Sequence, residues 1–513
     1  METQKLEFLK HLWHFKRHVY LDYNATTNVS IRVRRKMNHV LKYDYGNPSA
    51  LYGLARKSAA IMEAARQQVA DAIHADAHEI YFTGCATESN NAVLQSLSNY
   101  FYPKKKKIIS LPIEHPSVSN TLEFLKTQGI EVQYCPVDRH GRVLLAEFEK
   151  LIDGDTFLVC CMLANNEIGT IQDIAAIARI AGQHDALVLA DCVQALGKIP
   201  IDVHGWGIDY ASFSAHKLYG PKGVGALYVK SGSPFRPFMH GGHQESGMRA
   251  GTESLHNIAG FGAACQDVPK LLAHMEQVRF LKGQLVQRLK GIEPDCVINS
   301  PPEADCLANT LSITFPHANQ GELLAMLDYH GIAVSAASAC SAQEDKPSHV
   351  LKAIGLSDQA ARETIRVSLG CSTSARDIRY VTRVFKNFIK GRTLFVKMIA
   401  PAQLDETVLF AEQTYILDVR PQFLRRKVKG PPNVHELSFV TIEKYLPQLP
   451  RDKHILVVCQ HGNLSYIMAY YLKAKGFDQV SSLSNGVLGW KKRCSDLYEK
   501  YAGQNVTVLK PPK

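Results

Sequence analysis

Short apolar runs alternate with helix-length amphipathic stretches along most of this chain, and this alternation constrains its fold more than any other feature. Apolar runs cover residues 80–83, 157–162 and 186–190, and helical patterns cover 88–100 and 173–184. Strands that alternate with helices in this way form a largely parallel sheet with helices on its faces. The expected fold class is therefore α/β.

The pattern changes near Lys390, where a second and smaller α/β region begins. Strand-like apolar runs recur at 415–419 and 455–459, and a helical pattern covers 465–475. The 513 residues exceed the length of one ordinary domain, for which about 150 residues is typical. The expected organisation is a first domain at 1–390, a linker at 391–403 and a second domain at 404–513.

The composition is that of an intracellular globular protein. Apolar residues make up 46% of the chain and charged residues 21%. No window of about 18 residues is continuously apolar, so no transmembrane helix is expected. Lys, Arg and His interrupt residues 1–20, which therefore lack the apolar segment of a secretory signal. We expect a soluble cytoplasmic protein that makes no membrane contact.

Much of the formal net charge of +11 lies near the carboxyl end of the chain. Residues 391–513 hold 18 Lys and Arg against 10 Asp and Glu, an excess of eight. A basic region can bind nucleic acid or an acidic protein. No nucleic-acid-binding motif accompanies this charge, so a solvated surface is the simpler interpretation and no nucleic-acid partner is expected.

The 12 cysteines fit neither a disulfide framework nor a zinc site, because none of them forms a Cys-x-x-Cys pair and the chain is too large to need stapling. Most are expected to be small buried hydrophobic residues, and no metal site is expected. Two cysteines differ. Cys340 lies in the small-residue stretch SAASACS at 335–341, and Cys459 follows an apolar run and precedes Gln-His-Gly-Asn. Both surroundings predict exposed, reactive thiols.

Three separate features of the first domain suit one cofactor. Lys217 lies in SFSAHKLYGPKGVG at 212–225, ahead of a Gly/Pro-rich turn, where its amine could form a Schiff base. Asp191 ends an apolar run, and a buried carboxylate there needs a partner such as a protonated pyridine nitrogen. The turn TGCATE at 83–88 offers backbone N–H groups and a hydroxyl to a phosphate. Together they describe a site for pyridoxal 5'-phosphate.

Residues 19 to about 390 resemble a cysteine desulfurase of the class V aminotransferase family. The matching motifs are YLDYNATT at 20–27, GNPS at 46–49, TGCATESN at 83–90, EH at 114–115, ANNEIG at 164–169, DCVQ at 191–194, SAHK at 214–217, RAGTE at 249–253 and SAASACS at 335–341. The resemblance implies the fold type I architecture of pyridoxal phosphate enzymes. It implies a large cofactor-binding part at about 19–260 and a small part at about 261–390 with the N-terminal segment.

The same resemblance implies a role for individual residues. Lys217 binds the cofactor aldehyde and moves the Cα proton, His115 stacks on the ring and Asp191 pairs with the ring nitrogen. Arg366 holds the substrate carboxylate, and Cys340 attacks the cysteine sulfur, so that alanine leaves and a persulfide remains. The further contacts that it implies are Ala86, Thr87, Ser214 and His216 at the phosphate, Asn166 and Gln194 beside the ring, Asn166 also at the substrate, and Thr252 from the second subunit of a homodimer.

The C-terminal region resembles a single rhodanese domain, through LDVR at 417–420, VVCQHGNLS at 457–465 and NGVLGW at 485–490. A Cys459 thiol between a strand and a helix is surrounded by N–H groups that stabilise a thiolate or persulfide. Rhodaneses commonly carry arginines where this chain has Gln460 and Leu464, and those arginines bind an anionic sulfur donor. Thiosulfate sulfurtransferase activity is therefore not expected, whereas receipt of persulfide sulfur needs only a thiolate and access.

These features support three hypotheses. The first is a cysteine desulfurase that passes sulfur from Cys340 to Cys459 and on to an acceptor protein, such as an iron–sulfur scaffold or a sulfur carrier. The second is a selenocysteine lyase on the same fold, although Cys340 favours sulfur chemistry. The third makes the rhodanese domain a module that docks an acceptor and never carries sulfur, which the missing arginines and the basic charge both fit.

Overall fold

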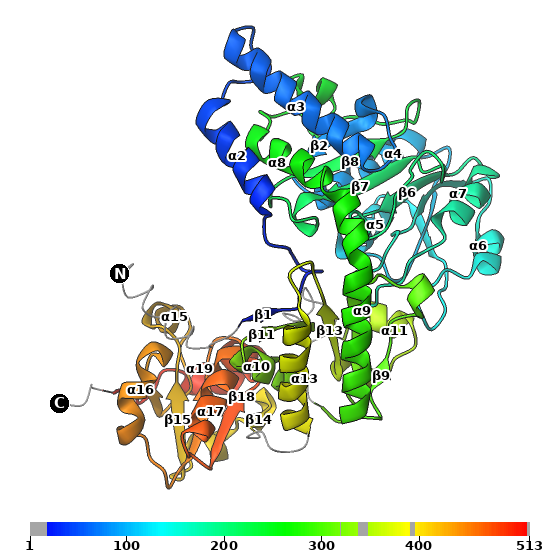
Figure 1. Ribbon diagram of the computed structural model, residues 1–513. Helices are drawn as coiled ribbons and strands as arrows, with labels where there is room; N and C mark the ends of the chain where they lie inside the picture. Colours follow the sequence, from blue (N-terminus) through cyan, green and yellow to red (C-terminus); the bar gives the residue numbers. More distant parts are fainter. Residues whose placement is uncertain (1–17, 319, 337–346, 390–395, 510–513) are drawn as a thin grey trace.

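The computed structural model describes residues 18–318, 320–336, 347–389 and 396–509 (Figure 1). Cys340 and part of the expected linker at 391–403 lie outside the described residues, so the domain boundaries given above stay predictions. No helix in the described ranges is both long and apolar enough to cross a membrane.

A seven-stranded sheet with strand order β2-β8-β7-β6-β5-β3-β4 forms the centre of the largest part of the molecule. Every neighbouring pair is parallel except the two pairs that β8 makes, so the expectation of a largely parallel α/β sheet is confirmed. The strands are β2 (Ile80–Thr83), β3 (Lys107–Ser110), β4 (Glu131–Tyr134), β5 (Thr156–Cys160), β6 (Leu187–Asp191), β7 (Tyr210–Ser214) and β8 (Gly225–Val229).

The helices that surround this sheet include the two that were expected from amphipathic spacing near 88–100 and 173–184. They are α4 (Ala86–Phe101), α5 (Pro116–Lys126), α6 (Leu145–Leu151) and α7 (Ile174–Gly182), together with α2 (Ile31–Tyr43), α3 (Gly53–Asp71) and α8 (Leu255–Cys265). Helices α2 and α3 both pack against α8. Because β6 and β7 are parallel and pair Asp191 with Ser212, the residues that follow both strands meet at one edge of the sheet.

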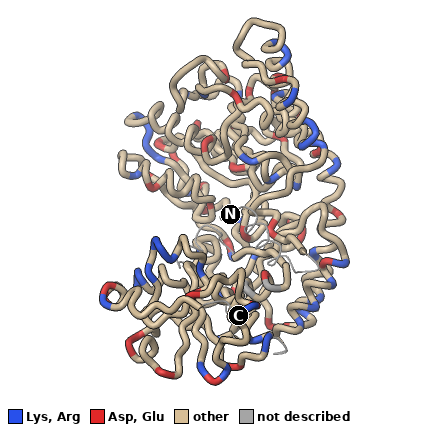
Figure 2. Tube along the Cα trace, turned by 90° about the vertical axis from the view of Figure 1, so that its left-hand side faces the viewer, with Lys and Arg blue, Asp and Glu red and all other residues tan. Residues whose placement is uncertain are grey.

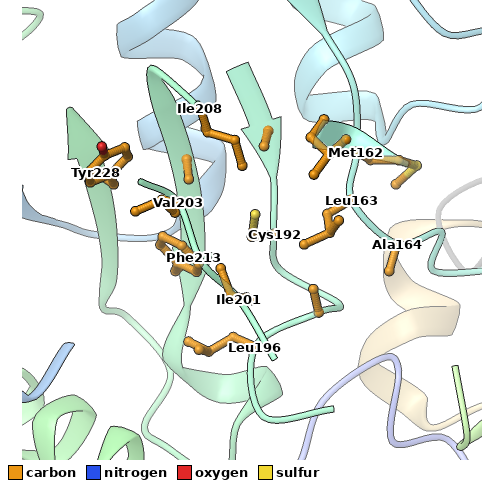
Figure 3. Packing of buried hydrophobic residues seen from close by; sticks show 14 of the residues in the cluster. Met162, Leu163, Ala164, Cys192, Leu196, Ile201, Val203, Ile208, Phe213 and Tyr228 are labelled. Carbon is orange, nitrogen blue, oxygen red and sulfur yellow. The ribbon is translucent and has the colours of Figure 1, made fainter. Parts of the chain in front are cut away.

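The core beneath that edge is apolar and closely packed. Figure 3 shows Cys192, the residue after the end of β6, within a group of side chains that includes Val203 and Phe213. Cys160 and Cys161 are likewise about 1% exposed, and burial raises the pKa of both thiols far above the usual value. For these cysteines the expectation of small buried hydrophobic residues is confirmed.

A second, smaller sheet with order β12-β13-β10-β9 follows the long helix α9 (Val268–Ile292). Strand β1 (Val19–Tyr20) pairs in parallel with β11 (Ile332–Ala333), and Asp22 bridges to Ser368, so the N-terminal segment belongs to this part. The remaining elements are β9 (Val297–Ile298), β10 (Thr310–Thr314), α10 (Gln320–Tyr329), β12 (Ser335–Ala336), α11 (His349–Ala353), α12 (Asp358–Arg362), β13 (Thr364–Ser368) and α13 (Ala375–Ile389), which packs against α9.

The C-terminal region has a six-stranded sheet of its own, in which every neighbouring pair is parallel. In spatial order its strands are β14 (Lys397–Ile399), β18 (Val480–Leu483), β17 (His454–Val458), β15 (Thr414–Asp418), β16 (Val434–Glu436) and β19 (Thr507–Val508). Its helices are α14 (Glu406–Leu409), α15 (Gln422–Lys427), α16 (Ile442–Tyr445), α17 (Asn463–Ala474), α18 (Gly486–Arg493) and α19 (Ser495–Tyr501).

Helix α17 packs against α10, so the C-terminal sheet is docked on the smaller part of the first domain (Figure 1). One continuous apolar cluster reaches from Leu311 and Met326 on one side to Tyr466 and Ala469 on the other. The two parts therefore share a buried interface. Lys and Arg are interspersed with Asp and Glu in both the upper and lower parts of the trace in Figure 2, as on an ordinary solvated surface.

Candidate active site

One cavity gathers most of the residues that were expected to bind the cofactor and the substrate. Those that line it are Ala86, Thr87, His115, Asn166, Asp191, Gln194, Ser214, His216, Lys217 and Arg366. Thr252 is absent from this wall and lines a separate pocket with Gly84 and Arg249. Cys459 lies in the C-terminal domain, and Cys340 lies outside the described residues.

Lys217 follows β7 in a short 3-10 turn and reaches back to the N-terminal segment. Its Nζ donates to the carbonyl oxygens of Asn24, at 2.6 Å, and Ala25, at 2.8 Å. Asn24 is about 1% exposed and is held from several directions, since its Oδ1 accepts from Nδ2 of Asn309 at 2.9 Å. Sequence reasoning assigned no role to Asn24, although the motif YLDYNATT that contains it was one of the signals used.

Asp191, at the end of β6, is a buried carboxylate that can accept more hydrogen bonds than the protein gives it. Its Oδ1 accepts from the N–H of Val193 at 3.0 Å, and its Oδ2 accepts from Nδ2 of Asn90 at 3.1 Å. A carboxylate can accept about four hydrogen bonds. The side chain therefore fits a further donor in the cavity, such as the protonated ring nitrogen of pyridoxal phosphate. Asn90 was not predicted as a site residue.

The N-terminus of α4 supplies the anion-binding end of the cavity. Its cap residue Cys85 makes no side-chain hydrogen bond to the helix, and Ser214 Oγ accepts the N–H of Ala86 at 3.0 Å. Gly225 permits this approach, because a Cβ there would lie 2.8 Å from the carbonyl carbon of Cys85. Burial, followed by the charge of Lys217, lowers the pKa of His216 to about 4. These groups suit a phosphate.

Arg366, on β13, is a buried guanidinium whose Nε makes no hydrogen bond to the described residues. Its Nη2 lies 2.8 Å from Asp22 Oδ1, and its Nη1 donates to the carbonyl of Asn166 at 3.0 Å. Its Nε is buried and has no hydrogen-bond partner among the described residues. Buried donors normally have partners, so this atom fits a ligand that brings an acceptor, and a carboxylate is the natural one.

The described residues on either side of position 340 contact residues of this cavity or next to it. Before it, Ala336 pairs with Ile365 in β13, next to Arg366. After it, Ser348 Oγ donates to Oε2 of Glu167 at 2.5 Å, and His349 Nε2 lies 2.9 Å from the carbonyl of Glu114. Glu167 itself lines the cavity, and burial raises its pKa to about 7.

Glu114 is a fully buried carboxyl group behind the cavity. Burial, and then the charge of Asp191, raise its pKa to about 8. Its Oε1 accepts the N–H of Met162 at 2.6 Å, and its Oε2 is buried without a partner among the described residues. Because the folded protein holds a proton here that the unfolded chain releases above the usual pKa of 4.5, this group's contribution to stability is lost as the pH rises to about 8.

Glu114→Gln is therefore expected to weaken the decline of stability with pH. The amide still offers an oxygen to the N–H of Met162 but has no proton to lose. Between pH 5 and pH 9 the free energy of unfolding should fall less in the variant than in the wild type, by a difference on the order of a few kcal/mol. Denaturant unfolding at several pH values measures this, with the exposed Glu149→Gln as control. Equal pH dependence in Glu114→Gln and the wild type would contradict the assignment.

Cys459, directly after β17, lies in a tight loop that leads into α17. Its Sγ accepts the N–H of Gly462 at 3.1 Å, and Gly462 has φ of +98°. The expectation of an exposed thiol is wrong, because Cys459 is about 3% exposed. The start of α18 covers the loop so closely that a Cβ at Gly486 would lie 2.4 Å from the carbonyl oxygen of Cys459.

The side chain of Gln460, in the same loop, is held by a hydrogen bond within the domain. Its Oε1 accepts from Nη1 of Arg420 at 3.2 Å. Arg420 is about 1% exposed and forms an ion pair with Asp418 at 2.7 Å. The Arg420 guanidinium is bonded within the domain, so it does not replace the arginines that are missing at positions 460 and 464.

The chain matches two protein families in two separate stretches. Residues 19–381 match the aminotransferase class-V family, and residues 401–493 match the rhodanese-like domain. The first match covers most of the chain and includes every residue that lines the cavity.

Curated relatives and solved structures agree with the first match. "Cysteine desulfurase IscS" of Dictyoglomus turgidum is 39% identical over 381 residues, which are 74% of this chain and 96% of that protein. The protein of the same name from Escherichia coli O139:H28 is 40% identical over 377 residues, covering 72% of this chain and 92% of the relative. A solved "NifS-like protein" is 39% identical with a TM-score of 0.69, and covers 73% of this chain and 100% of its own. "SspA in complex with cysteine" is 36% identical with a TM-score of 0.62, and covers 69% and 100%.

Proposed function

This chain belongs to the aminotransferase class-V family, and we propose that it is a pyridoxal phosphate-dependent cysteine desulfurase that converts L-cysteine to L-alanine. The observation that carries the proposal is one cavity that combines Lys217, the buried Asp191, the open N-terminus of α4 and the unused Nε of Arg366. An amine, an acid, an anion cradle and a carboxylate-binding guanidinium are the groups that this cofactor and an amino-acid substrate require.

When bound, pyridoxal phosphate withdraws electrons from the substrate Cα, which makes the Cα proton acidic and the sulfur open to attack by a thiolate. The protein supplies the remaining functions. Arg366 would orient the substrate carboxylate, and Asp191 would hold the ring nitrogen. Lys217 would bind the cofactor aldehyde and would take up the Cα proton. The carbonyl groups of Asn24 and Ala25 accept hydrogen bonds from its ammonium form, which stabilises the lysine while it carries that proton.

Cys340 is the proposed nucleophile that takes the sulfur. In the sequence it lies four residues after Ala336, the last described residue before it. Ala336 pairs with the residue before Arg366, and the segment returns to the wall of the cavity at Ser348. The described residues on both sides of position 340 thus contact the site, which supports the assignment of Cys340 as the nucleophile.

We further propose that sulfur passes from Cys340 to Cys459 within the docked assembly. Gln320, at the start of α10, donates to the carbonyl of Thr364. The next residue of β13, Ile365, pairs with Ala336 at the end of β12. Ala336, the last described residue before Cys340, therefore lies on the side where α10 begins.

Helix α17 begins on the same side. Burial, and then the charge of Glu322 near the start of α10, raise the pKa of Tyr466 near the start of α17. The ring of His330, after the end of α10, lies 6.2 Å from the ring of Tyr470 farther along α17. The two helices thus run in similar directions, and the Cys459 loop precedes α17 at the end that faces the start of α10. This arrangement supports transfer within one chain.

The final acceptor is proposed to be a protein, such as an iron–sulfur scaffold or a sulfur carrier. The burial of Cys459 means that transfer requires the loop beneath α18 to open, whereas the docking hypothesis requires no such opening. The selenocysteine lyase hypothesis differs in needing no thiol at position 340. The expected cytoplasmic location stays a prediction.

Mass spectrometry of the full-length protein after brief exposure to L-cysteine tests the proposed function. A persulfide on Cys340 together with released alanine is the expected result, and turnover of cysteine should leave sulfur on the enzyme before any acceptor is added. Parallel assays with L-selenocysteine separate the desulfurase from the lyase. Faster selenium release that is independent of Cys340, with no persulfide from cysteine, would overturn the proposal.

A homodimer is proposed as the active unit. Thr252 lies outside the cavity of its own chain, as a residue that completes the phosphate site of a partner subunit would. Large apolar side chains are also exposed on and after α2, which suits an interface. They are Leu41, Tyr43, Tyr45, Leu51 and Tyr52, each at least half exposed.

Leu51→Asp is expected to dissociate the dimer, because Leu51 is 90% exposed in the single chain and a carboxylate would be costly to bury. Sedimentation at working concentration should show a dimer for the wild type and a weaker one, by at least tenfold in dissociation constant, for the variant. Phe280→Asp on α9, where the ring is 59% exposed, is the matched control. A fully active wild-type monomer would contradict the proposal.

A further inference from the structure

Four polar groups form one chain of hydrogen bonds from the end of β6 to His115. Asp191 Oδ2 accepts from Nδ2 of Asn90 at 3.1 Å, and the same Nδ2 donates to Oγ of Ser117 at 2.9 Å. Ser117 Oγ lies 2.9 Å from Nδ1 of His115. Asn90, Ser117 and Asp191 are all less than 9% exposed, so these are contacts in a dry environment.

The Asp191 carboxylate determines which group donates and which accepts in every hydrogen bond of this series. The Asp191 carboxylate only accepts, so the Asn90 atom that faces it is the amide nitrogen. That nitrogen has two hydrogens, and the second goes to Ser117 Oγ, which therefore acts as an acceptor toward Asn90. The hydroxyl hydrogen of Ser117 remains for His115, and Nδ1 must accept it.

A second donor also requires Nδ1 of His115 to act as an acceptor. The imidazole caps α5, since its Nδ1 also accepts the backbone N–H of Ser117 at 3.1 Å. Two donors aimed at one ring nitrogen leave no room for a proton on it. The positive end of the α5 dipole likewise disfavours a charged imidazolium at this position.

We propose that Ser117 and Asn90 are positioning residues that hold His115 as a neutral imidazole with its proton on Nε2. In this form His115 presents an N–H donor and an uncharged ring to the cavity, and it has no free nitrogen with which to accept a proton there. The inference rests on the proposed function only in what the cavity is said to bind, because the hydrogen bonds join groups of the protein alone.

The charged and titratable groups around His115 agree with a neutral ring. Burial is the largest cause that lowers the pKa of His115, and Lys217 and His349 lower it further. Asp191 acts in the opposite sense, toward the charged form. Asn90 and Ser117 stand between Asp191 and the imidazole, so the carboxylate is bonded to the amide and makes no direct ion pair with the ring.

Nitrogen NMR of full-length protein labelled with ¹⁵N in its histidines tests the inference, with His115→Gln to identify the signal. In both the holoenzyme and the cofactor-free protein, His115 should show a protonated Nε2 and a bare Nδ1 throughout pH 6 to 8. Ser117→Ala removes one donor and should raise the His115 pKa by about one unit, a tenfold change in the protonated fraction. Ser117→Thr, which keeps the hydroxyl, should restore the wild-type titration.

Asn90→Ala should move the titration in the same direction by a smaller amount, because the Ser117 hydroxyl is then free to turn away. A proton on Nδ1 in the wild type, or a titration that Ser117→Ala leaves unchanged, would overturn the inference. Because the cofactor-free arm requires no turnover, these results are independent of whether the protein desulfurates cysteine.

Discussion

Lys217→Ala is expected to abolish both covalent attachment of the cofactor and turnover of cysteine. Among the described residues of the cavity wall no other side chain offers an amine, so none of them replaces Lys217 as the group that binds the aldehyde and takes the Cα proton. Loss of a positioned general base alone costs about 10²–10⁴ in rate, and alanine production should fall by at least about a thousandfold.

Borohydride reduction followed by peptide mapping measures the attachment directly. The wild type should carry the mass of the cofactor on Lys217, and Lys217→Ala should carry it nowhere. Lys230→Ala is the matched control, because Lys230 is an exposed lysine just beyond β8. Alanine production by Lys217→Ala within tenfold of the wild type would show that the role assigned to this lysine is wrong.

Cys340→Ala and Cys459→Ala are expected to fail in different ways. Cys340 makes the first sulfur–sulfur bond, so its loss should remove the persulfide and lower alanine production by about a hundredfold or more. Cys459 acts later. Its loss should leave alanine production and the persulfide on Cys340 within about twofold of the wild type while stopping delivery to the acceptor protein. An assay with dithiothreitol would hide this, since a small thiol can take sulfur from Cys340 directly.

Cysteine labelled with heavy sulfur, followed by peptide mapping at several times, separates the two steps. Label should reach Cys340 first and Cys459 second, and Cys459 should stay unlabelled in Cys340→Ala. Cys494→Ala is the control within the same domain, because Cys494 is a half-buried thiol that directly follows α18. If an acceptor receives sulfur while Cys459 never carries label, the relay is wrong and the docking hypothesis takes its place.

The features that sequence reasoning recovered depend on short stretches of chain. The strand before Asp191, the turn around Lys217 and the helix that begins at Ala86 each follow from the residues next to them. Phosphate binding at a helix N-terminus and the alternation of strand and helix are local properties, so their signals are present in a single sequence.

The residues that it missed act across long separations. Asn24 reaches Asn309, and Asn90 reaches Asp191, through contacts that no local spacing encodes. The burial of Cys459 was missed for the same reason, since a strand-to-loop cysteine is exposed or covered according to where a later helix, α18, packs. Polar side chains such as these look like ordinary surface residues until the fold brings their partners to them.

The sequence by itself predicted the α/β architecture, because periodicity is a property of neighbouring residues, and its resemblance to a family predicted the set of groups that would bind the cofactor. Only the tertiary structure decided that ten of these residues share one cavity and that Thr252 lies apart from them. It alone showed that Asn90 and Ser117 connect Asp191 to His115 through hydrogen bonds and that α17 docks on α10. Such contacts arise from the packing of whole elements, and packing depends on the entire chain.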